Sequence, residues 1–89
     1  MILNIEDAFS YFNKSYEYAH QINDNRQMAL ALTNLAAVQL ERNDYAKAIE
    51  NANKSIKYLT ALNDYNGLGE TYNILGMVYK EQKNYMQSS

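Results

Sequence analysis

Apolar and small residues recur every three or four positions along almost the whole chain. Between residues 4 and 22 this stripe consists of Ala8, Phe9, Phe12, Ser15, Tyr16, Ala19 and Ile22. Such spacing places side chains on one face of an α-helix, and it predicts a helix over residues 4–22. The same periodicity predicts further helices over residues 26–41, 45–61 and 68–82.

Short segments rich in asparagine and aspartate separate the predicted helices. Asn4 is a suitable N-cap for the first helix. Asn43 is expected to adopt the left-handed C-cap conformation, and Asp44 to cap the helix that follows. Connections this short make neighbouring helices antiparallel. Asn66-Gly67 is expected to form the loop into the helix over 68–82, and Lys83-Asn84 to repeat the tight turn, so that Tyr85 starts a fifth helix.

The sequence repeats itself at an offset of 40 residues. Asn13-Lys14-Ser15 and Asn23-Asp24 return as Asn53-Lys54-Ser55 and Asn63-Asp64. Further along, Leu35, Val38, Glu41 and Tyr45 return as Leu75, Val78, Glu81 and Tyr85. A fixed period of this length predicts a repeat architecture, whose unit here is helix–turn–helix.

The repeat resembles the tetratricopeptide repeat (TPR) family. One unit reads Leu32…Asn34-Leu35-Ala36…Asp44-Tyr45…Ala48-Ile49-Glu50…Lys54, and the next reads Tyr72…Leu75-Gly76…Tyr79…Gln82…Asn84-Tyr85. This resemblance implies an all-α fold of antiparallel helix–turn–helix repeats, an α-α solenoid that winds into a right-handed superhelix. It also implies that Ala36 and Gly76 are small because the second helix of the same unit crosses there. The 40-residue period exceeds the family's typical length of about 34, and no proline ends the unit, so the chain resembles a longer subclass of the family.

Residues 1–89 are therefore expected to form a single array of four helices plus a C-terminal stub. In this scheme residues 4–22 are the second helix of a partial repeat, residues 26–61 are a complete repeat, and residues 68–89 are another partial repeat. Repeats bury their faces only against neighbouring repeats, and arrays normally end in polar caps. Neither end of this chain has such a cap, which predicts a fragment of a longer array. Uncovered faces near Phe9/Phe12 and Tyr72/Tyr79 would favour self-association.

The resemblance also implies a function, protein–protein interaction, in which a scaffold binds a peptide or partner helix on its concave groove. The first helices of the units line that groove, with Thr33, Asn34, Ala37, Leu40, Glu41, Glu70, Asn73, Met77 and Lys80 at its exposed positions. An asparagine amide can both donate to and accept from a peptide backbone, so Asn34 and Asn73 are suited to contact a ligand. The lysine-rich clamp by which some family members bind a C-terminal carboxylate is disfavoured, because Thr33 and Ala37 stand in its place.

Two alternatives stay open. The chain could be the ligand-sensing regulatory segment of a larger signalling or transcription-regulating protein. It could also bind a small molecule between its helices.

Composition narrows the classes of function. Eight basic and ten acidic residues give a net charge of −2, which does not favour nucleic acid or an anionic membrane as a partner. With no cysteine and only His20 as an imidazole ligand, no metal is expected. The sequence contains no phosphate-binding loop or nucleophile motif, so neither an enzyme nor a cofactor is expected. Tyr16, Tyr45, Tyr72, Tyr79 and Tyr85 are expected to pack against other helices. No signal or membrane-spanning segment is present, which favours a cytoplasmic protein.

Overall fold

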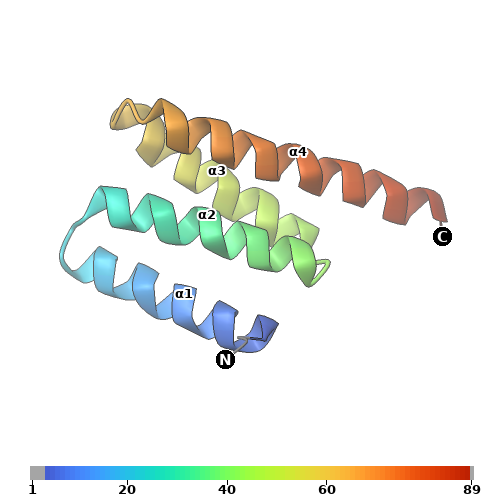
Figure 1. Ribbon diagram of the computed structural model, residues 1–89, viewed down its shortest axis with the longest axis horizontal. Helices are drawn as coiled ribbons and strands as arrows, with labels where there is room; N and C mark the ends of the chain where they lie inside the picture. Colours follow the sequence, from blue (N-terminus) through green and yellow to red (C-terminus); the bar gives the residue numbers. More distant parts are fainter. Residues whose placement is uncertain (1–3, 89) are drawn as a thin grey trace.

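The computed structural model describes residues 4–88, which form four helices packed side by side. The helices are α1 (Ile5–Gln21), α2 (Asn25–Glu41), α3 (Tyr45–Ala61) and α4 (Tyr65–Ser88), and consecutive helices run in opposite directions (Figure 1). The all-α class is confirmed. The first three helices begin and end within one residue of their expected limits.

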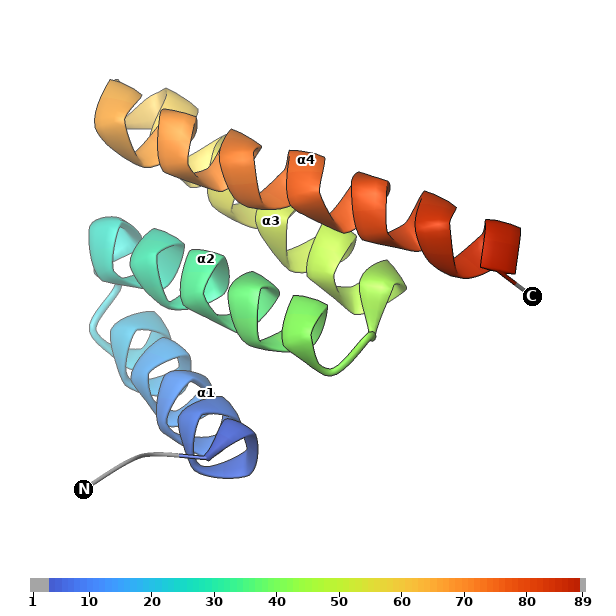
Figure 2. The same ribbon diagram turned by 45° about the vertical axis from the view of Figure 1, so that its right-hand side comes forward.

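The middle helix α2 organises the packing. It contacts α1, α3 and α4, and α3 also contacts α4. In the part of the chain that the structure describes, α1 and α4 do not touch, and they lie on either side of α2 (Figure 2). The core is correspondingly concentrated on α2 and consists of Ala19, Met28, Ala29, Ala31, Leu32, Leu35, Ala36, Val38, Ala48, Ala52, Leu59 and Val78.

One turn geometry joins the helices at all three connections. Asn23, Asn43 and Asn63 have φ angles of 56°, 62° and 55°, in the left-handed region that asparagine tolerates better than most residues. The N–H of the following aspartate donates to a carbonyl five residues earlier, at 2.8–3.0 Å. This pairing is the Schellman C-cap, which satisfies carbonyls that the helix end would leave unbonded. The left-handed conformation expected for Asn43 is confirmed.

Side-chain caps begin three of the helices. The Oδ1 atoms of Asn4, Asp24 and Asp64 accept hydrogen bonds from the N–H groups of Asp7, Gln27 and Gly67, at 2.8, 3.1 and 3.0 Å. The N-cap expected at Asn4 is confirmed. Asp44 occupies the N-cap position of α3, as expected, although its side chain makes no capping hydrogen bond.

Helix α4 differs from expectation at both ends. Because Asp64 caps it, the helix begins at Tyr65 and includes Asn66-Gly67, which were expected in a loop. It then continues through Lys83-Asn84 to Ser88, so the expected turn is wrong and the described residues contain no fifth helix. The repeat explains the difference: lysine stands at position 83, where each earlier turn has a left-handed asparagine. Tyr85 packs edge-to-face against Tyr45, with ring centroids 6.2 Å apart.

A buried cluster of hydroxyl groups ties α2, α3 and α4 together. Thr33 Oγ1 lies 2.6 Å from Ser55 Oγ and 2.9 Å from Thr71 Oγ1. Ser55 also donates to the Ala29 carbonyl, and Thr71 to the Gly67 carbonyl, at 2.9 and 2.8 Å. Buried polar atoms need such partners, because an unpaired hydroxyl would lose its hydrogen bonds to water without replacement.

Candidate binding surface

A recess of about 300 Å³ lies between the N-terminal halves of α2 and α4. The buried residues Ala29 and Leu59 border it, and Leu30 adds a side chain that is 52% exposed. Gly67 also lines the recess, where a Cβ atom would sit 2.8 Å from Leu59 Cδ2. Glycine therefore lets α3 and α4 approach closely at this point. The remaining lining residues are Arg26, Gln27, Thr33, Asp64, Asn66 and Glu70.

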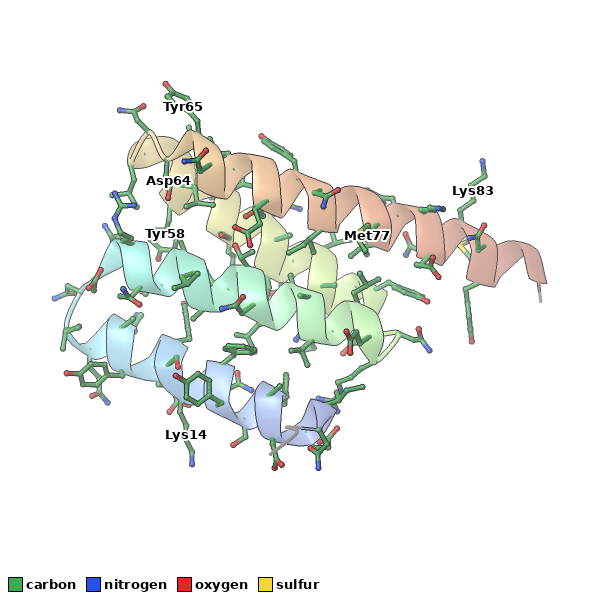
Figure 3. All side chains as sticks on the ribbon, in the orientation of Figure 1. Lys14, Tyr58, Asp64, Tyr65, Met77 and Lys83 are labelled. Carbon is green, nitrogen blue, oxygen red and sulfur yellow. The ribbon has the colours of Figure 1, made fainter. Side chains whose placement is uncertain are left out.

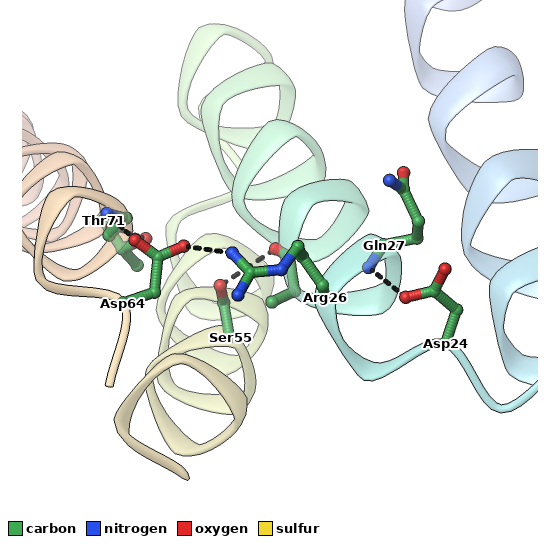
Figure 4. Close-up of polar contacts among 8 residues, drawn as sticks. Asp24, Arg26, Gln27, Ser55, Asp64 and Thr71 are labelled. Atoms are coloured by element: carbon green, nitrogen blue, oxygen red, sulfur yellow. Dashed lines mark hydrogen bonds and ion pairs between the residues drawn. The ribbon is translucent and has the colours of Figure 1, made fainter. Parts of the chain in front are cut away.

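One ion pair spans the mouth of the recess. Arg26 Nη1 donates to Asp64 Oδ2 at 3.2 Å, joining the start of α2 to the start of α4 (Figure 4). The same aspartate caps α4 through its other carboxylate oxygen. Because the Arg26 side chain is 60% exposed, the pair contributes at most about 1 kcal/mol. It positions the arginine rather than holding the helices together.

Thr33 lines the α2–α4 recess, but it is not exposed as the sequence predicted. The residue is only 6% exposed and takes part in the hydroxyl cluster with Ser55 and Thr71. Its assignment as an exposed groove position was wrong. Helical spacing places Thr33 toward α4, but the contact with Thr71 fills that space.

Three other expected positions lie elsewhere. Asn34, Ala37 and Glu41 line a second recess, of about 210 Å³, between α2 and α1. Across it lie Asn4, the N-cap of α1, and Ile5, Ala8 and Phe12 of α1. Helical spacing keeps Asn34 and Ala37 on the Leu30 side of α2, and Leu30 and Asn34 line a third recess together beside α1.

The expected positions on α4 are exposed. Glu70 lines the α2–α4 recess. Asn73, Met77 and Lys80 are exposed further along the helix, where Met77 lies on the side of α4 that is lower in Figure 3. Leu40, the remaining position, is half-buried. The nine positions predicted to share one groove are thus divided between buried or half-buried positions, two recesses and open surface.

The sequence interpretation missed Arg26, Leu30 and Asn66, which line the α2–α4 recess. Helical spacing could have identified these residues, because they lie one or two turns from the expected positions, toward the N-terminus of each helix. It was overlooked on α4 because the helix was expected to begin only at residue 68.

Three tyrosines expected to be packed are largely exposed. Tyr72, Tyr79 and Tyr85 are 55%, 51% and 62% exposed, whereas Tyr16 and Tyr45 are half-buried as expected. Gly76 lies on the same side of α4 as Tyr72 and Tyr79, by helical spacing. No second helix crosses it in residues 4–88, and a Cβ atom added there would meet nothing within 4 Å. The crossing expected at Ala36 is present, since Ala36 is fully buried.

Two classes of site receive no support from the described residues. They contain no group of three or more histidine, cysteine, aspartate or glutamate side chains that could hold a metal ion. None of the helices described is long and apolar enough to cross a membrane.

Antiparallel helices joined by three equivalent turns, with a 40-residue sequence repeat, define a helical-repeat protein. Residues 4–61, which comprise α1, α2 and α3, match the family model described as tetratricopeptide repeat. This match covers more than half of the chain, and the protein belongs to the tetratricopeptide repeat family. Repeats of this family are non-catalytic scaffolds that generally mediate protein–protein interactions. Comparison with curated proteins and with solved structures gave no match.

Proposed function

We propose that the protein binds a segment of a partner protein, as an extended peptide or a helix, in the recess between α2 and α4. The observation that carries this proposal is the exposed Leu30 side chain at a recess bordered by the apolar residues Ala29 and Leu59. A partner that inserted one apolar side chain would cover this surface and gain the associated hydrophobic stabilisation.

Polar groups around the recess suggest how a bound segment would be oriented. Asn66 lines the recess and Asn73 lies two helical turns further along α4, so their amides are available to a peptide backbone. Glu70 favours a lysine or arginine beside the inserted apolar residue. Arg26 is already paired with Asp64, which disfavours an acidic ligand at this end.

A displayed-peptide library selected on the folded protein provides a probe of this site. We expect Leu30→Glu to weaken binding of a selected peptide by at least about tenfold, the equivalent of 1.4 kcal/mol. Ile22→Glu is the matched control, because Ile22 is an aliphatic residue of nearly equal exposure, 51% against 52%, outside the recess. Equal losses in the two variants, or no loss in Leu30→Glu, would overturn the assignment.

The two asparagines originally expected to bind a peptide give a second comparison. Asn73→Ala should weaken the selected peptide more than Asn34→Ala does, because Asn34 lines the recesses beside α1 and not the α2–α4 recess. Circular dichroism of both variants checks that the helices are retained. Weakening by Asn34→Ala alone would move the site to the α1–α2 side of the molecule.

A further inference from the structure

Helices α1 and α4 each have a face that no other described helix covers, and the repeat relates these two faces to a contact already present. Residues of α1 recur 40 positions later in α3, and residues of α2 recur 40 positions later in α4. The face of α3 that packs on α2 therefore has its equivalent on α1. The face of α2 that packs on α3 has its equivalent on α4.

The contact between α2 and α3 provides the template. Ser55 Oγ donates to the Ala29 carbonyl at 2.9 Å, and Asn51 Nδ2 donates to Gln39 Oε1 at 2.7 Å. These two hydrogen bonds fix the antiparallel alignment of the helices. The middle of the contact lies between them, where Ala36 on α2 and Ala52 on α3 are both fully buried.

The positions of α4 that are equivalent to two buried alanines of α2 are occupied by glycine. Ala29 and Ala36 correspond to Gly69 and Gly76, and a Cβ atom added at either glycine would meet nothing within 4 Å. Glycine is less favourable than alanine inside a helix, so it needs a reason such as the close approach of another backbone. Gly67 has such a reason in the nearby Leu59 side chain, whereas Gly69 and Gly76 have none in the described residues. They lie seven residues apart, on one face of the helix.

The residues of α1 complement those of α4. In the template, Ala36 of α2 lies near Ala52 of α3. The corresponding residues are Gly76 on α4 and Phe12 on α1. Where α4 has a smaller residue than the template, α1 therefore has a larger one. Gln39 and Asn51 correspond to Tyr79 and Tyr11, which are 51% and 63% exposed. An amide hydrogen bond would thus be replaced by an aromatic pair.

The serine of the template contact is also present on α1. Ser55 corresponds to Ser15, whose hydroxyl donates to the Tyr11 carbonyl in its own helix at 3.0 Å. Beside α1, Phe12 borders two recesses, one shared with Ala8 and Ala37 and the other with Ser15 and Leu30. The surface around Phe12 is therefore open and hollowed on the side where a further helix would lie.

We propose that the α4 face of one molecule binds the α1 face of a second molecule, in the arrangement by which α2 binds α3. The occupant is a second copy of this chain, because the two open faces match one another residue by residue and neither is covered by another helix in residues 4–88. Such a contact joins two different faces, so it is heterologous and leads to an open chain or a closed ring of molecules. The straight course of α4 through Lys83 leaves its face open to this contact, and the Lys83 side chain points away from the other helices (Figure 3).

Blocked variants of the protein test this contact by sedimentation velocity over a wide concentration range. The unmodified chain should form a series of species larger than a dimer. Gly76→Arg should block the α4 face and Ser15→Arg the α1 face, so each variant alone should be monomeric. An equimolar mixture should form a 1:1 dimer, because each variant retains the face that the other lacks. Ser10→Arg places the same side chain at an exposed position of α1 and should assemble like the unmodified protein.

Three results would overturn the proposal. The first is an unmodified chain that stays monomeric, because the two faces would then not bind each other and could be covered only by other segments of a longer array. The second is self-association of either blocked variant at the level of the unmodified chain. The third is a mixture of blocked variants that stays monomeric while both retain their circular dichroism, because it would mean that α1 and α4 do not bind each other. None of these results bears on the α2–α4 recess, which is tested separately by the selected peptide.

Discussion

Substituting Gly76 by alanine should have opposite effects on the single molecule and on its assembly. Within one molecule the added methyl group meets nothing within 4 Å, and alanine is more favourable than glycine in a helix by about 0.5–1 kcal/mol. A domain of this size gains roughly 4–8 °C in Tm per kcal/mol, so Gly76→Ala should raise Tm by about 2–8 °C.

In the proposed assembly the same methyl group would have to fit against Phe12 of a second molecule. Overpacking of a close contact costs about 1–3 kcal/mol. Since 1.4 kcal/mol corresponds to a tenfold change, association should weaken by about 5- to 150-fold. Thermal melts followed by circular dichroism measure the first effect, and sedimentation velocity measures the second. The melts must be made at a dilution where both proteins are monomeric, because association itself raises Tm.

A less stable Gly76→Ala monomer, or unchanged association of this variant, would contradict the proposed role of Gly76. Gly67→Ala is the matched control, because a Cβ atom there would lie 2.8 Å from Leu59 Cδ2 and should offset or exceed the gain in helix stability. Combining Gly76→Ala with Phe12→Ala recreates the alanine pair of the α2–α3 contact. We expect the double variant to associate more tightly than the sum of the two single losses implies, which a double-mutant cycle measures.

Three further substitutions test how the fold is stabilised, with chemical denaturation as the assay. Asp64→Ala removes the cap of α4 and the ion pair with Arg26 and should cost about 1 kcal/mol; Asp44→Ala, at an N-cap without a side-chain hydrogen bond, should cost clearly less, and equal losses would contradict the capping argument. Leu32→Ala removes a side chain that is 2% exposed and should cost about 2–5 kcal/mol; a loss below 1 kcal/mol would mean that α2 is not the centre of the core. Thr33→Val should cost about 0.5–1.5 kcal/mol for the lost hydroxyl contacts and should change the affinity of a peptide selected on the recess only slightly, because Thr33 borders the recess but is 6% exposed. A large loss of affinity without a change in stability would mean that the Thr33 hydroxyl contacts the peptide.

The residues at the helix ends decide how well the sequence predicts the fold. The helix over 45–61 was predicted with its observed limits because both flanking turns contain a left-handed asparagine, Asn43 and Asn63. The turn expected at residues 83–84 does not form, because position 83 holds a lysine and not an asparagine in the left-handed conformation. Tyr85 repeats Tyr45, but a matching residue at one position does not allow the residues before it to form a turn.

The candidate site was harder to predict because α2 contacts three helices. A helix packed on three sides has no single polar face, so periodicity alone could not separate Thr33, which faces the hydroxyl cluster, from Asn34, which faces α1. The contacts that distinguish them involve Thr71 and Phe12, which come from other helices. Positions near the helix starts, such as Leu30, were predictable in principle from the same spacing.

Backbone amide chemical shifts can show whether a partner segment binds in the recess between α2 and α4. Isotope-labelled protein would be titrated with a peptide selected on the folded chain, below the concentration at which the protein associates. We expect the largest shift changes at four residues that line the recess, Arg26, Leu30, Asn66 and Glu70. Changes confined to α1 and the outer face of α3, around Lys14 and Lys54, would contradict it.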